Sequence, residues 1–498
     1  MELPFEKKVC RYYRQKRYEL VNVEQTQELK LPEAMPDVER IVAVWGQVIL
    51  RGKDWHPGSA QVNGGVMVWV LYSPEGDGPL QRLESWIPWK AGVDFPASEE
   101  DGVIRAECVL RSVDARSVSG RKLMLRAGVG VLTQVLCPES AELYLPQELP
   151  DDLERLEQTY PLVMTAEAGE KPFLVEEILN LPAGMPPVAQ LVYYHMEPEL
   201  LDQKVMGSKA VFRGVGNLHL LYLDDQGKLY GQDFEVPFAQ YVDLDGEYEM
   251  DTQIMDLLGV TSLELEPQPE GTLQLKCGMV GQYIINTVMT AQVLEDAYSP
   301  CRDVELEYQT LELPVWVQQL QQNEPLHGDM QIENGTVVDL SASVDAPTVT
   351  SRPGEDTIQC GCSFHALIQQ EDGTCVGKTV KAESSTQWQT ACDTICFSWL
   401  KGTASCRKTG QNWRMETQTA LDLGALCRQE LKMVTGITLG EERKPDPQRP
   451  SVIIRARGSD QSLWEMAKDC GSTVGAIRKL NQLEGEPESD QLLLIPVI

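Results

Sequence analysis

Val66-Met67-Val68-Trp69-Val70-Leu71-Tyr72 decides the fold class of this chain. Its β-branched and aromatic residues favour a strand, and the Pro, Gly and Asp residues that follow favour a turn. Residues 218–223 and 364–370 have the same form, and turn-forming segments follow them at 224–227 and 371–373. Each of the three stretches therefore predicts a strand that enters a hairpin turn.

Alternating apolar residues extend this β pattern. They occupy every second position of 123–129 and of 273–279, which places one face of a strand on a core. Helical patterns are scarce before residue 450, where 152–159 and 175–179 are short candidates. The sequence predicts a mainly β protein made of antiparallel β-sandwich or barrel-like domains.

One unit of the sequence is repeated. Residues 31–38, Leu-Pro-Glu-Ala-Met-Pro-Asp-Val, return at 181–188 as Leu-Pro-Ala-Gly-Met-Pro-Pro-Val, an offset of 150 (181 minus 31). The same offset places 71–72 on 221–222 and 123–126 on 273–276, and 361–368 with 413–417 indicate a third, divergent copy. We expect three repeated β domains, at 1–148, 149–300 and 301–440, each able to bury its own core.

The end of the chain has a different pattern. Three prolines and mixed charges predict an extended linker at 441–450. After it, 451–457 favour a strand, 462–468 a helix, 474–480 a second helix capped by Ser472 or Thr473 and ended by Asn481, and 492–496 a strand. Residues 451–498 therefore predict a small β-α-α-β domain, with Trp464 in its core.

The net charge excludes several functions. The chain of 498 residues has a formal charge of −32, which repels nucleic acids and anionic membranes. We expect no membrane span and no signal peptide, since the apolar runs are short and the first residues have no apolar core. A cytosolic protein is expected, and its 13 cysteines are then free thiols.

We expect no catalytic residue, no metal and no cofactor. Residues 372–379 resemble a phosphate-binding loop with the wrong glycine spacing, and their position predicts a hairpin. Cys360, Cys362 and His365, or Cys392 with Cys396, lack the spacing of zinc ligands, so buried thiols are the simpler interpretation. An enzyme in one β domain remains an alternative that requires a pocket of converging titratable groups. Trp86 and Trp89 are candidates either for partner binding or for packing at a strand edge.

The last segment resembles a LysM domain, through Leu463-Trp464-x-x-Ala467, Thr473-Val474, Leu480-Asn481 and Ile495-Pro496. The resemblance implies a shallow groove between two loops, which binds N-acetylglucosamine polymers in many LysM domains. The loop at 458–464 is longer than usual, and Ser489-Asp490-Gln491 replaces the usual Pro-Gly-Gln, so glycan and protein partners both remain open. The groove residues implied here are Gly458, Ser459, Asp460, Gln461, Ser462, Asn481, Gln482 and Leu483.

The upstream units, with Leu-Pro…Met-Pro-Asp and a following Val-x-Gly-x-Val style strand, resemble the SPOCS domain of clostridial sporulation proteins. SPOCS repeats followed by one LysM domain resemble the layout of the SipL-like family. The resemblance implies a non-enzymatic adaptor that binds a stage IV sporulation protein A-like ATPase, partly through the LysM domain. It also implies a place in the mother-cell cytosol, at the forespore surface where the spore coat forms. The alternative is a cell-wall protein that binds peptidoglycan.

Overall fold

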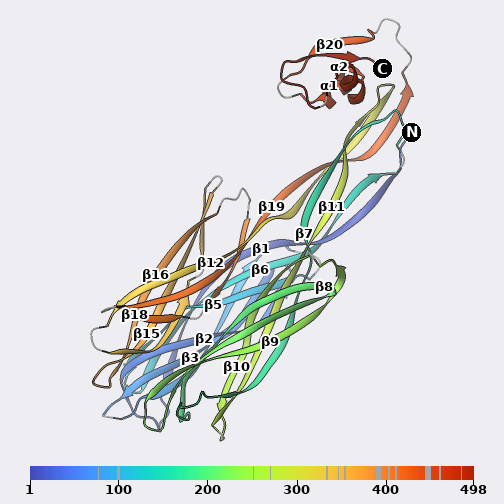
Figure 1. Cartoon of the computed structure of the whole chain (residues 1–498). Coiled ribbons are helices and arrows are strands. Elements are labelled where there is room, and N and C mark those ends of the chain that lie inside the picture. The colour runs from blue at the N-terminus through green and yellow to red at the C-terminus, as the bar shows by residue number, and fades with distance from the viewer. Residues whose placement is uncertain are drawn as a thin grey trace.

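The computed structural model is mainly β, as expected, and contains antiparallel sheets and two short helices. It describes all residues except 77, 98–100, 148, 251, 270, 333–334, 346, 353–354, 389–393, 402–403, 410–411, 444–449, 459–460 and 484. Figure 1 shows three groups of strands packed side by side, long ribbons that extend from them, and a small domain at the far end of the ribbons.

The first β unit makes two three-stranded sheets, in the orders β1-β6-β5 and β2-β3-β4. Its strands are β1 (Phe5–Lys30), β2 (Val38–His56), β3 (Ser59–Pro74), β4 (Gln81–Asp94), β5 (Val103–Ser119) and β6 (Lys122–Pro146).

The second β unit has the sheet orders β10-β11-β7 and β8-β9. Its strands are β7 (Glu154–Asn180), β8 (Gln190–Leu223), β9 (Leu229–Tyr248), β10 (Gln253–Pro267) and β11 (Thr272–Tyr298).

The third β unit has the sheet orders β12-β19-β17, with β18 beside β19, and β13-β15-β14, with β16 beside β15. Its strands are β12 (Arg302–Gln331), β13 (Thr336–Val344), β14 (Thr348–Arg352), β15 (Glu355–Gln369), β16 (Cys375–Trp388), β17 (Thr394–Lys401), β18 (Ser405–Thr409) and β19 (Asn412–Glu442). The division into repeated domains at 148, 300 and 440 stays a prediction, although β19 extends two residues into the expected linker.

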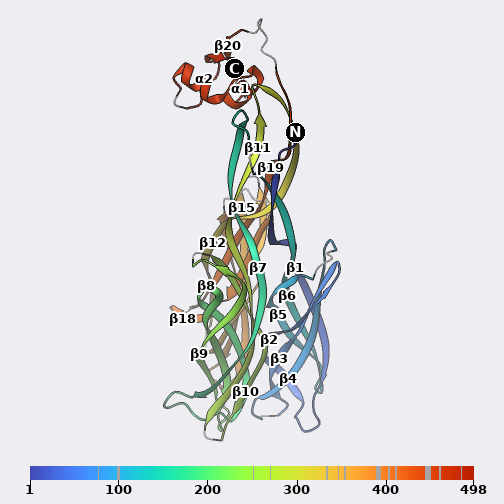
Figure 2. The same ribbon diagram turned by 90° about the vertical axis from the view of Figure 1, so that its right-hand side faces the viewer.

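Each unit pairs its first strand with its last strand along nearly their whole length. The pairs are β1 with β6, β7 with β11 and β12 with β19. Their outer ends leave the sheets as three two-stranded ribbons, which we call the stalk (Figures 1 and 2). The stalk has its own apolar core, to which all three ribbons contribute: Cys10, Tyr12, Leu143, Leu162, Val293, Leu313 and Met433.

The repeated Leu-Pro…Met-Pro segment forms the same turn in the first two units. The amide of Met35 donates to the carbonyl of Pro32 at 3.0 Å, and that of Met185 donates to Pro182 at 3.1 Å. The hydroxyl of Tyr72 then donates to the carbonyl of Pro36 at 3.1 Å, and the Tyr222 hydroxyl donates to Pro186 at 3.0 Å. The segment is therefore a turn held against the strand that decides the fold class.

Two expectations about local structure are wrong, and one is confirmed. Residues 152–159 and 175–179 form no helices, because 154–180 are strand β7, whose whole length pairs with β11. The pairing with a distant strand outweighs the helical tendency of these two short amphipathic segments. Residues 370–374 make the expected hairpin turn between β15 and β16, where Gly373 has a φ of 85°.

Some apolar clusters join residues of different units. The cluster centred on Tyr193, Phe212 and Leu221 of the second unit includes Trp45 and Trp69 of the first unit, and Leu367 of the third is part of it as well. Similarly, Leu132 of the first unit belongs to the cluster of the third. The three units therefore share some of their buried apolar surfaces.

The last 48 residues form the terminal module, 451–498, with the expected β-α-α-β order. Its elements are β20 (Val452–Ala456), α1 (Leu463–Cys470), α2 (Val474–Asn481) and β21 (Leu492–Pro496). Ser462 caps α1 in a capping box with Glu465, and Thr473 caps α2, so the predicted helix starts are correct. Leu463, Met466, Ile477, Leu493 and Ile495 form its core.

Candidate functional site

The predicted groove loops lie on one end of the terminal module, and only part of them is open to a ligand. Gly458 and Gln482 are exposed, whereas Gln461 and Leu483 are partly buried. Ser459 and Asp460 lie outside the described residues. The Leu483 side chain packs on the module core, and its amide donates to the carbonyl of Arg478 at 3.0 Å.

Two predicted groove residues hold the fold together. The hydroxyl of Ser462 accepts a hydrogen bond from the Glu465 amide at 3.2 Å and so caps α1. The Asn481 side chain donates to the carbonyl of Leu494 at 2.6 Å and accepts from the amide of Leu494 at 2.8 Å. It thereby pairs with one edge of β21 as another strand would. Both side chains therefore have hydrogen bonds that support the fold of the module.

Arg457 joins the first predicted groove loop to the segment before β21. Its Nε donates to the carbonyl of Gln461 at 2.8 Å, and its Nη1 donates to the carbonyl of Pro487. Its backbone also pairs with Gln491 at 3.0 Å and Asp490 at 2.9 Å. The Arg457 guanidinium therefore connects the first predicted groove loop to the segment that precedes β21.

The terminal module is docked on the tip of the stalk through an aromatic contact. Tyr298, the last residue of β11, is 5% exposed and belongs to the module's apolar cluster. Its ring meets Trp464 edge-on, with 4.8 Å between the centroids and 71° between the planes. The Tyr298 hydroxyl donates to the carbonyl of Ser472 at 2.9 Å. Trp464, which we expected inside the module core, is partly buried and lies at this contact.

Asp296 is the charged centre of the same contact. Its carboxylate accepts hydrogen bonds from the Trp464 indole at 2.8 Å, from Lys468 at 2.7 Å and from Tyr308 of β12 at 3.0 Å. Burial raises the pKa of Asp296, but the hydrogen bonds from Lys468, Trp464 and Tyr308 outweigh it and lower the pKa below its usual value. The module is thus tied to β11, whose Asp296 is also bonded to β12, and no local sequence pattern pointed to Asp296 or Tyr298.

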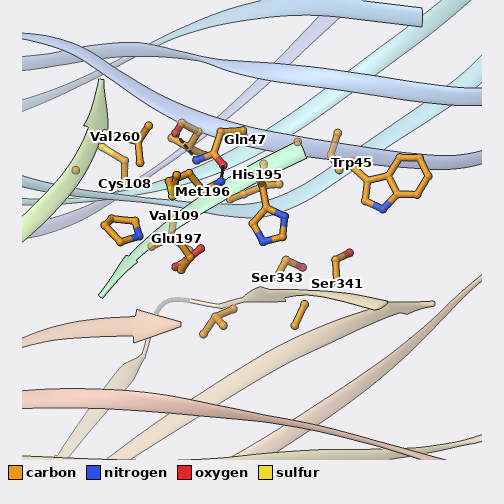
Figure 3. Close-up of a pocket in the computed structure, with 18 of the residues that line it drawn as sticks. Trp45, Gln47, Cys108, Val109, His195, Met196, Glu197, Val260, Ser341 and Ser343 are labelled. Atoms are coloured by element: carbon orange, nitrogen blue, oxygen red, sulfur yellow. Dashed lines mark hydrogen bonds between the residues drawn. The ribbon is translucent and has the colours of Figure 1, made fainter. Parts of the chain in front are cut away.

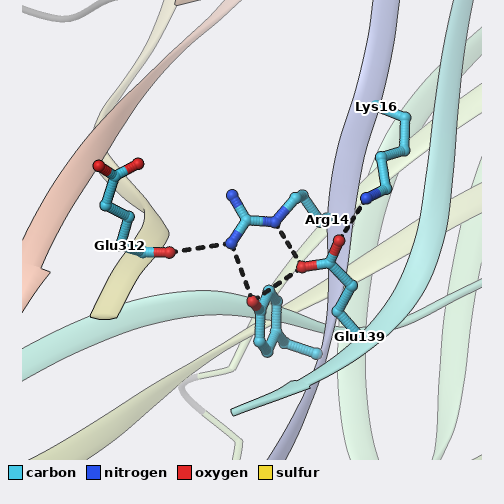
Figure 4. A network of polar contacts seen from close by, with 5 residues as sticks. Arg14, Lys16, Glu139 and Glu312 are labelled. Carbon is cyan, nitrogen blue, oxygen red and sulfur yellow. Dashed lines mark hydrogen bonds and ion pairs between the residues drawn. The ribbon is translucent and has the colours of Figure 1, made fainter. Parts of the chain in front are cut away.

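Within the stalk, a second polar network joins the first and third units (Figure 4). The Glu139 carboxylate on β6 accepts from Arg14, Lys16 and Tyr12, the last at 3.0 Å. Arg14 also donates to the carbonyl of Glu312 on β12 at 2.9 Å. Burial raises the pKa of Glu139, yet hydrogen bonds from Lys16 and Arg14 lower it overall. The network fixes how the ribbons of the stalk pack.

Between the three units lies a cavity of about 140 Å³. The first unit lines it with Gln47 and Cys108, the second with His195 and Glu197, and the third with Ser343. Figure 3 shows His195 facing the serine side chains of β13 across the space. The ring of His195 also stacks on Tyr193, with 5.7 Å between the centroids and 7° between the planes. The cavity is thus lined from three separate sheets by both apolar and polar side chains.

Buried polar side chains join the units around this cavity. The Gln282 amide, which is fully buried, accepts from the Ala106 amide at 2.8 Å and donates to the Ala106 carbonyl at 2.9 Å. It covers the open edge of β5 in the first unit. His219 of the second unit contacts Asp233 and also Asp339 of the third unit, each at 2.6 Å. Burial lowers the pKa of His219, but these two carboxylates outweigh it and raise the pKa to about 10.

The other candidate residues have structural surroundings. Cys360 and Cys362 are buried in the third unit's core, and His365 contacts Ser343 and Thr379, both at 3.1 Å. Cys392 and the Cys396 side chain lie outside the described residues. Cys427 is disulfide-bonded, contrary to the expectation of free thiols throughout.

The two tryptophans named as partner anchors differ in exposure. Trp89 is 2% exposed and belongs to the first unit's core. Trp86 is partly buried beneath the guanidinium of Arg51, which lies 5.1 Å from the ring centroid.

No three His, Cys, Asp or Glu side chains among the described residues are placed to hold a metal ion. No described helix is both long and apolar enough to cross a membrane.

One family of known proteins matches part of the second unit. Residues 187–257 match the family described as "SipL, SPOCS domain". This range begins at the Pro-Val end of the second Leu-Pro…Met-Pro segment, and it includes β8, β9 and the start of β10. Comparisons with curated proteins and with solved structures gave no match. The expected resemblance to SipL-like proteins is therefore confirmed for residues 187–257, which are similar to a SPOCS domain.

Proposed function

We propose that the chain is a non-enzymatic adaptor in spore-coat morphogenesis. It would bind a coat morphogenetic ATPase of the stage IV sporulation protein A type, partly through the terminal module, which we propose is a LysM domain. It would act in the mother cell, at the forespore surface. The SPOCS match at 187–257 is the observation that carries this proposal, since that domain is described for a sporulation protein.

The position of the terminal module supports the adaptor role. The stalk holds the module away from the three units, so a partner can reach it without meeting their strongly acidic surface (Figure 2). The module has five Lys or Arg and seven Asp or Glu, a net charge of −2 out of the chain's −32. An adaptor needs such a separation, because one end must stay accessible while the other end binds elsewhere.

The state of the groove favours a protein partner over a glycan. A glycan-binding groove has polar side chains directed at sugar hydroxyls. Here Ser462 and Asn481 form hydrogen bonds within the module, and Arg457 bonds the carbonyl of Gln461 in the first loop. The alternative, a protein that binds peptidoglycan or other N-acetylglucosamine polymers, therefore ranks second.

The test is capture of the purified full-length chain by the immobilised ATPase. Removing residues 445–498 should lower the captured amount at least tenfold, because the module is lost. The Asp296→Asn variant should keep most of the capture, because the module remains attached and folded. Full capture without 445–498 would assign binding to the β units and refute the role of the module.

A parallel sedimentation assay addresses the alternative. The full-length chain is mixed with insoluble peptidoglycan and, separately, with chitin. We expect it to stay in the supernatant with both. Sedimentation that disappears when residues 445–498 are removed would favour the cell-wall function over the adaptor.

A further inference from the structure

A groove of about 820 Å³ lies along β3 and β4 of the first unit, among the blue strands of Figure 2. Residues of β1, β2, β3 and β4 line it, and the exposed ones are Gln25, Arg51, Pro88 and Lys90. Its volume lies in the range of roughly 300–1,000 Å³ that is usual for ligand sites. The groove also includes Trp86, one of the two tryptophans named above as candidates for partner binding.

Two adjacent glycines of β3 make room for the two tryptophans of β4. A Cβ on Gly64 would lie 2.6 Å from the Trp89 ring, and a Cβ on Gly65 would lie 2.0 Å from the Trp86 ring. Neighbouring side chains of a strand point to opposite faces of the sheet. Trp89 is therefore buried in the core on one face, whereas Trp86 lies on the other face and stays partly exposed.

The inner of these two contacts belongs to the fold, because the second unit repeats it. Gly214 lies 150 residues after Gly64, and it pairs with Phe238 as Gly64 pairs with Trp89. A Cβ on Gly214 would lie 2.4 Å from the Phe238 ring, which is buried. An aromatic ring packed on a glycine is thus part of the core in both units.

The outer contact is replaced in the second unit. Trp86 pairs with Met67 across the sheet, and the corresponding pair of the second unit is Glu235 with Asn217. The same strands pair there with polar side chains on this face, so the fold does not require Trp86. A partly exposed tryptophan without a necessary role in the fold indicates contact with a partner, because tryptophan and arginine are enriched at binding hot spots.

The groove is positively charged although the chain is strongly acidic. The Arg51 guanidinium lies 5.1 Å from the centre of the Trp86 ring, and Lys90 lines the same groove. None of the described residues that line it is Asp or Glu, whereas the chain has 75 Asp or Glu and 43 Lys or Arg. Among the described side chains, no carboxylate lies within ion-pair distance of Arg51 or Lys90. Both cations are therefore open to a carboxylate from another molecule.

We propose that this groove binds an acidic segment of a partner protein that also carries aromatic or aliphatic side chains. A carboxylate of the segment accepts two hydrogen bonds from the Arg51 guanidinium, and a second carboxylate pairs with Lys90. An apolar side chain of the segment packs on Trp86. Nucleic acids and anionic membranes bring many charges towards a chain of net charge −32 and are repelled, whereas a short segment brings only a few. The groove is a binding surface separate from the terminal module and does not depend on the ATPase.

Fluorescence anisotropy with a labelled ten-residue peptide tests the inference. The peptide contains two Asp and two Phe among Gly and Ser, and the full-length chain is titrated to 300 µM. We expect a dissociation constant on the order of 100 µM at 0.05 M NaCl, and weaker binding at 0.3 M because salt screens exposed charges. The same peptide with Asn in place of Asp should bind at least tenfold more weakly. Equal binding of the two peptides, or no binding of the Asp peptide at 300 µM, would overturn the inference.

Matched variants locate the site. Arg51→Glu should lower the affinity for the Asp peptide at least tenfold. Arg116→Glu is the control, because it makes the same change of charge at a side chain on β5 that is 79% exposed and lies outside the groove. Trp86→Glu introduces the residue type that the second unit has at the corresponding position, so it should keep the fold and lose the binding. Equal losses of affinity for Arg51→Glu and Arg116→Glu would show an effect of net charge alone and refute the site.

Vesicles of phosphatidylglycerol test the competing kind of anionic partner. We expect them neither to sediment the chain nor to displace the labelled peptide, since the acidic chain is repelled by their surface. Displacement of the peptide by vesicles, with no displacement from the Arg116→Glu control by neutral phosphatidylcholine vesicles, would assign the groove to a lipid surface. The inference of a peptide partner would then be wrong.

Discussion

Replacing His219 with Gln should loosen the contact between the second and third units, and the effect should depend on pH. His219 on β8 is 16% exposed and contacts Asp339 on β13, whose side chain is fully buried. Gln has no charge, so the Asp339 carboxylate loses its cation. Breaking a buried ion pair by removing one partner costs about 3–5 kcal/mol. We expect a loss near the lower end, about 3 kcal/mol at pH 7, because Gln can still donate one hydrogen bond.

The pH dependence follows from the raised pKa. The folded pKa of His219 is about 10 and the ordinary value is 6.5, so the stabilisation is complete below pH 6.5 and is lost as pH rises towards 10. The full shift corresponds to a ceiling of about 5 kcal/mol at about 1.4 kcal/mol per pKa unit. Asp233 is 70% exposed, so solvent screens its share, and the expected loss is closer to 3 kcal/mol.

Urea unfolding at pH 6.5, 8 and 9.8, followed by hydrogen exchange in β13, measures the effect. The unmodified chain should lose stability across this range, while the His219→Gln chain should change much less. His327→Gln is the control, because His327 lies on β12 and is exposed. The reasoning is refuted if both variants lose the same free energy of unfolding, or if the His219→Gln chain keeps the pH slope of the unmodified chain.

Three further predictions concern single contacts. Asp296→Asn should weaken module docking by about 1–2 kcal/mol and speed hydrogen exchange in α1. In the unmodified chain, docking should persist above the ordinary Asp pKa and weaken as pH falls below it, because the pKa of Asp296 is lowered in the folded chain. Ser462→Ala should cost the module about 1 kcal/mol in thermal unfolding, whereas Ser489→Ala at an exposed turn should cost nothing measurable. Gln282→Leu should destabilise the chain by about 2–4 kcal/mol in urea unfolding, because the buried backbone groups of Ala106 lose their partners; a loss below about 0.5 kcal/mol would contradict this.

Local patterns predicted the local structure well. The helical spacing at 462–480, the cap candidates Ser472 and Thr473, and a period-two alternation identified the module and the strands, because these signals depend on neighbours within a few residues. The turn at 31–36 was recognised only as a repeated motif, and its cause, the Tyr72 hydroxyl on Pro36, became visible in the structure.

The arrangement of the units could not be predicted from such signals. His219 and Asp339 are 120 residues apart, and Asp296 and Lys468 are 172 apart. Their pairing depends on how whole sheets pack, and a carboxylate on a strand looks the same in sequence whether it faces solvent or a neighbouring unit. The misplaced helix at 175–179 has the same origin, because only its pairing with β11 makes it a strand.

The stalk also sets a length. An antiparallel ribbon grows by about 3.4 Å for each residue added to both of its strands, and its side chains alternate between faces. Adding two residues to each strand of every ribbon would move the module about 7 Å outwards while keeping Tyr298 directed at Trp464. Adding one residue would turn Tyr298 to the opposite face and detach the module. The length of the ribbons therefore sets how far the module lies from the β units. Changes in that length should be tolerated only in steps of two residues per strand.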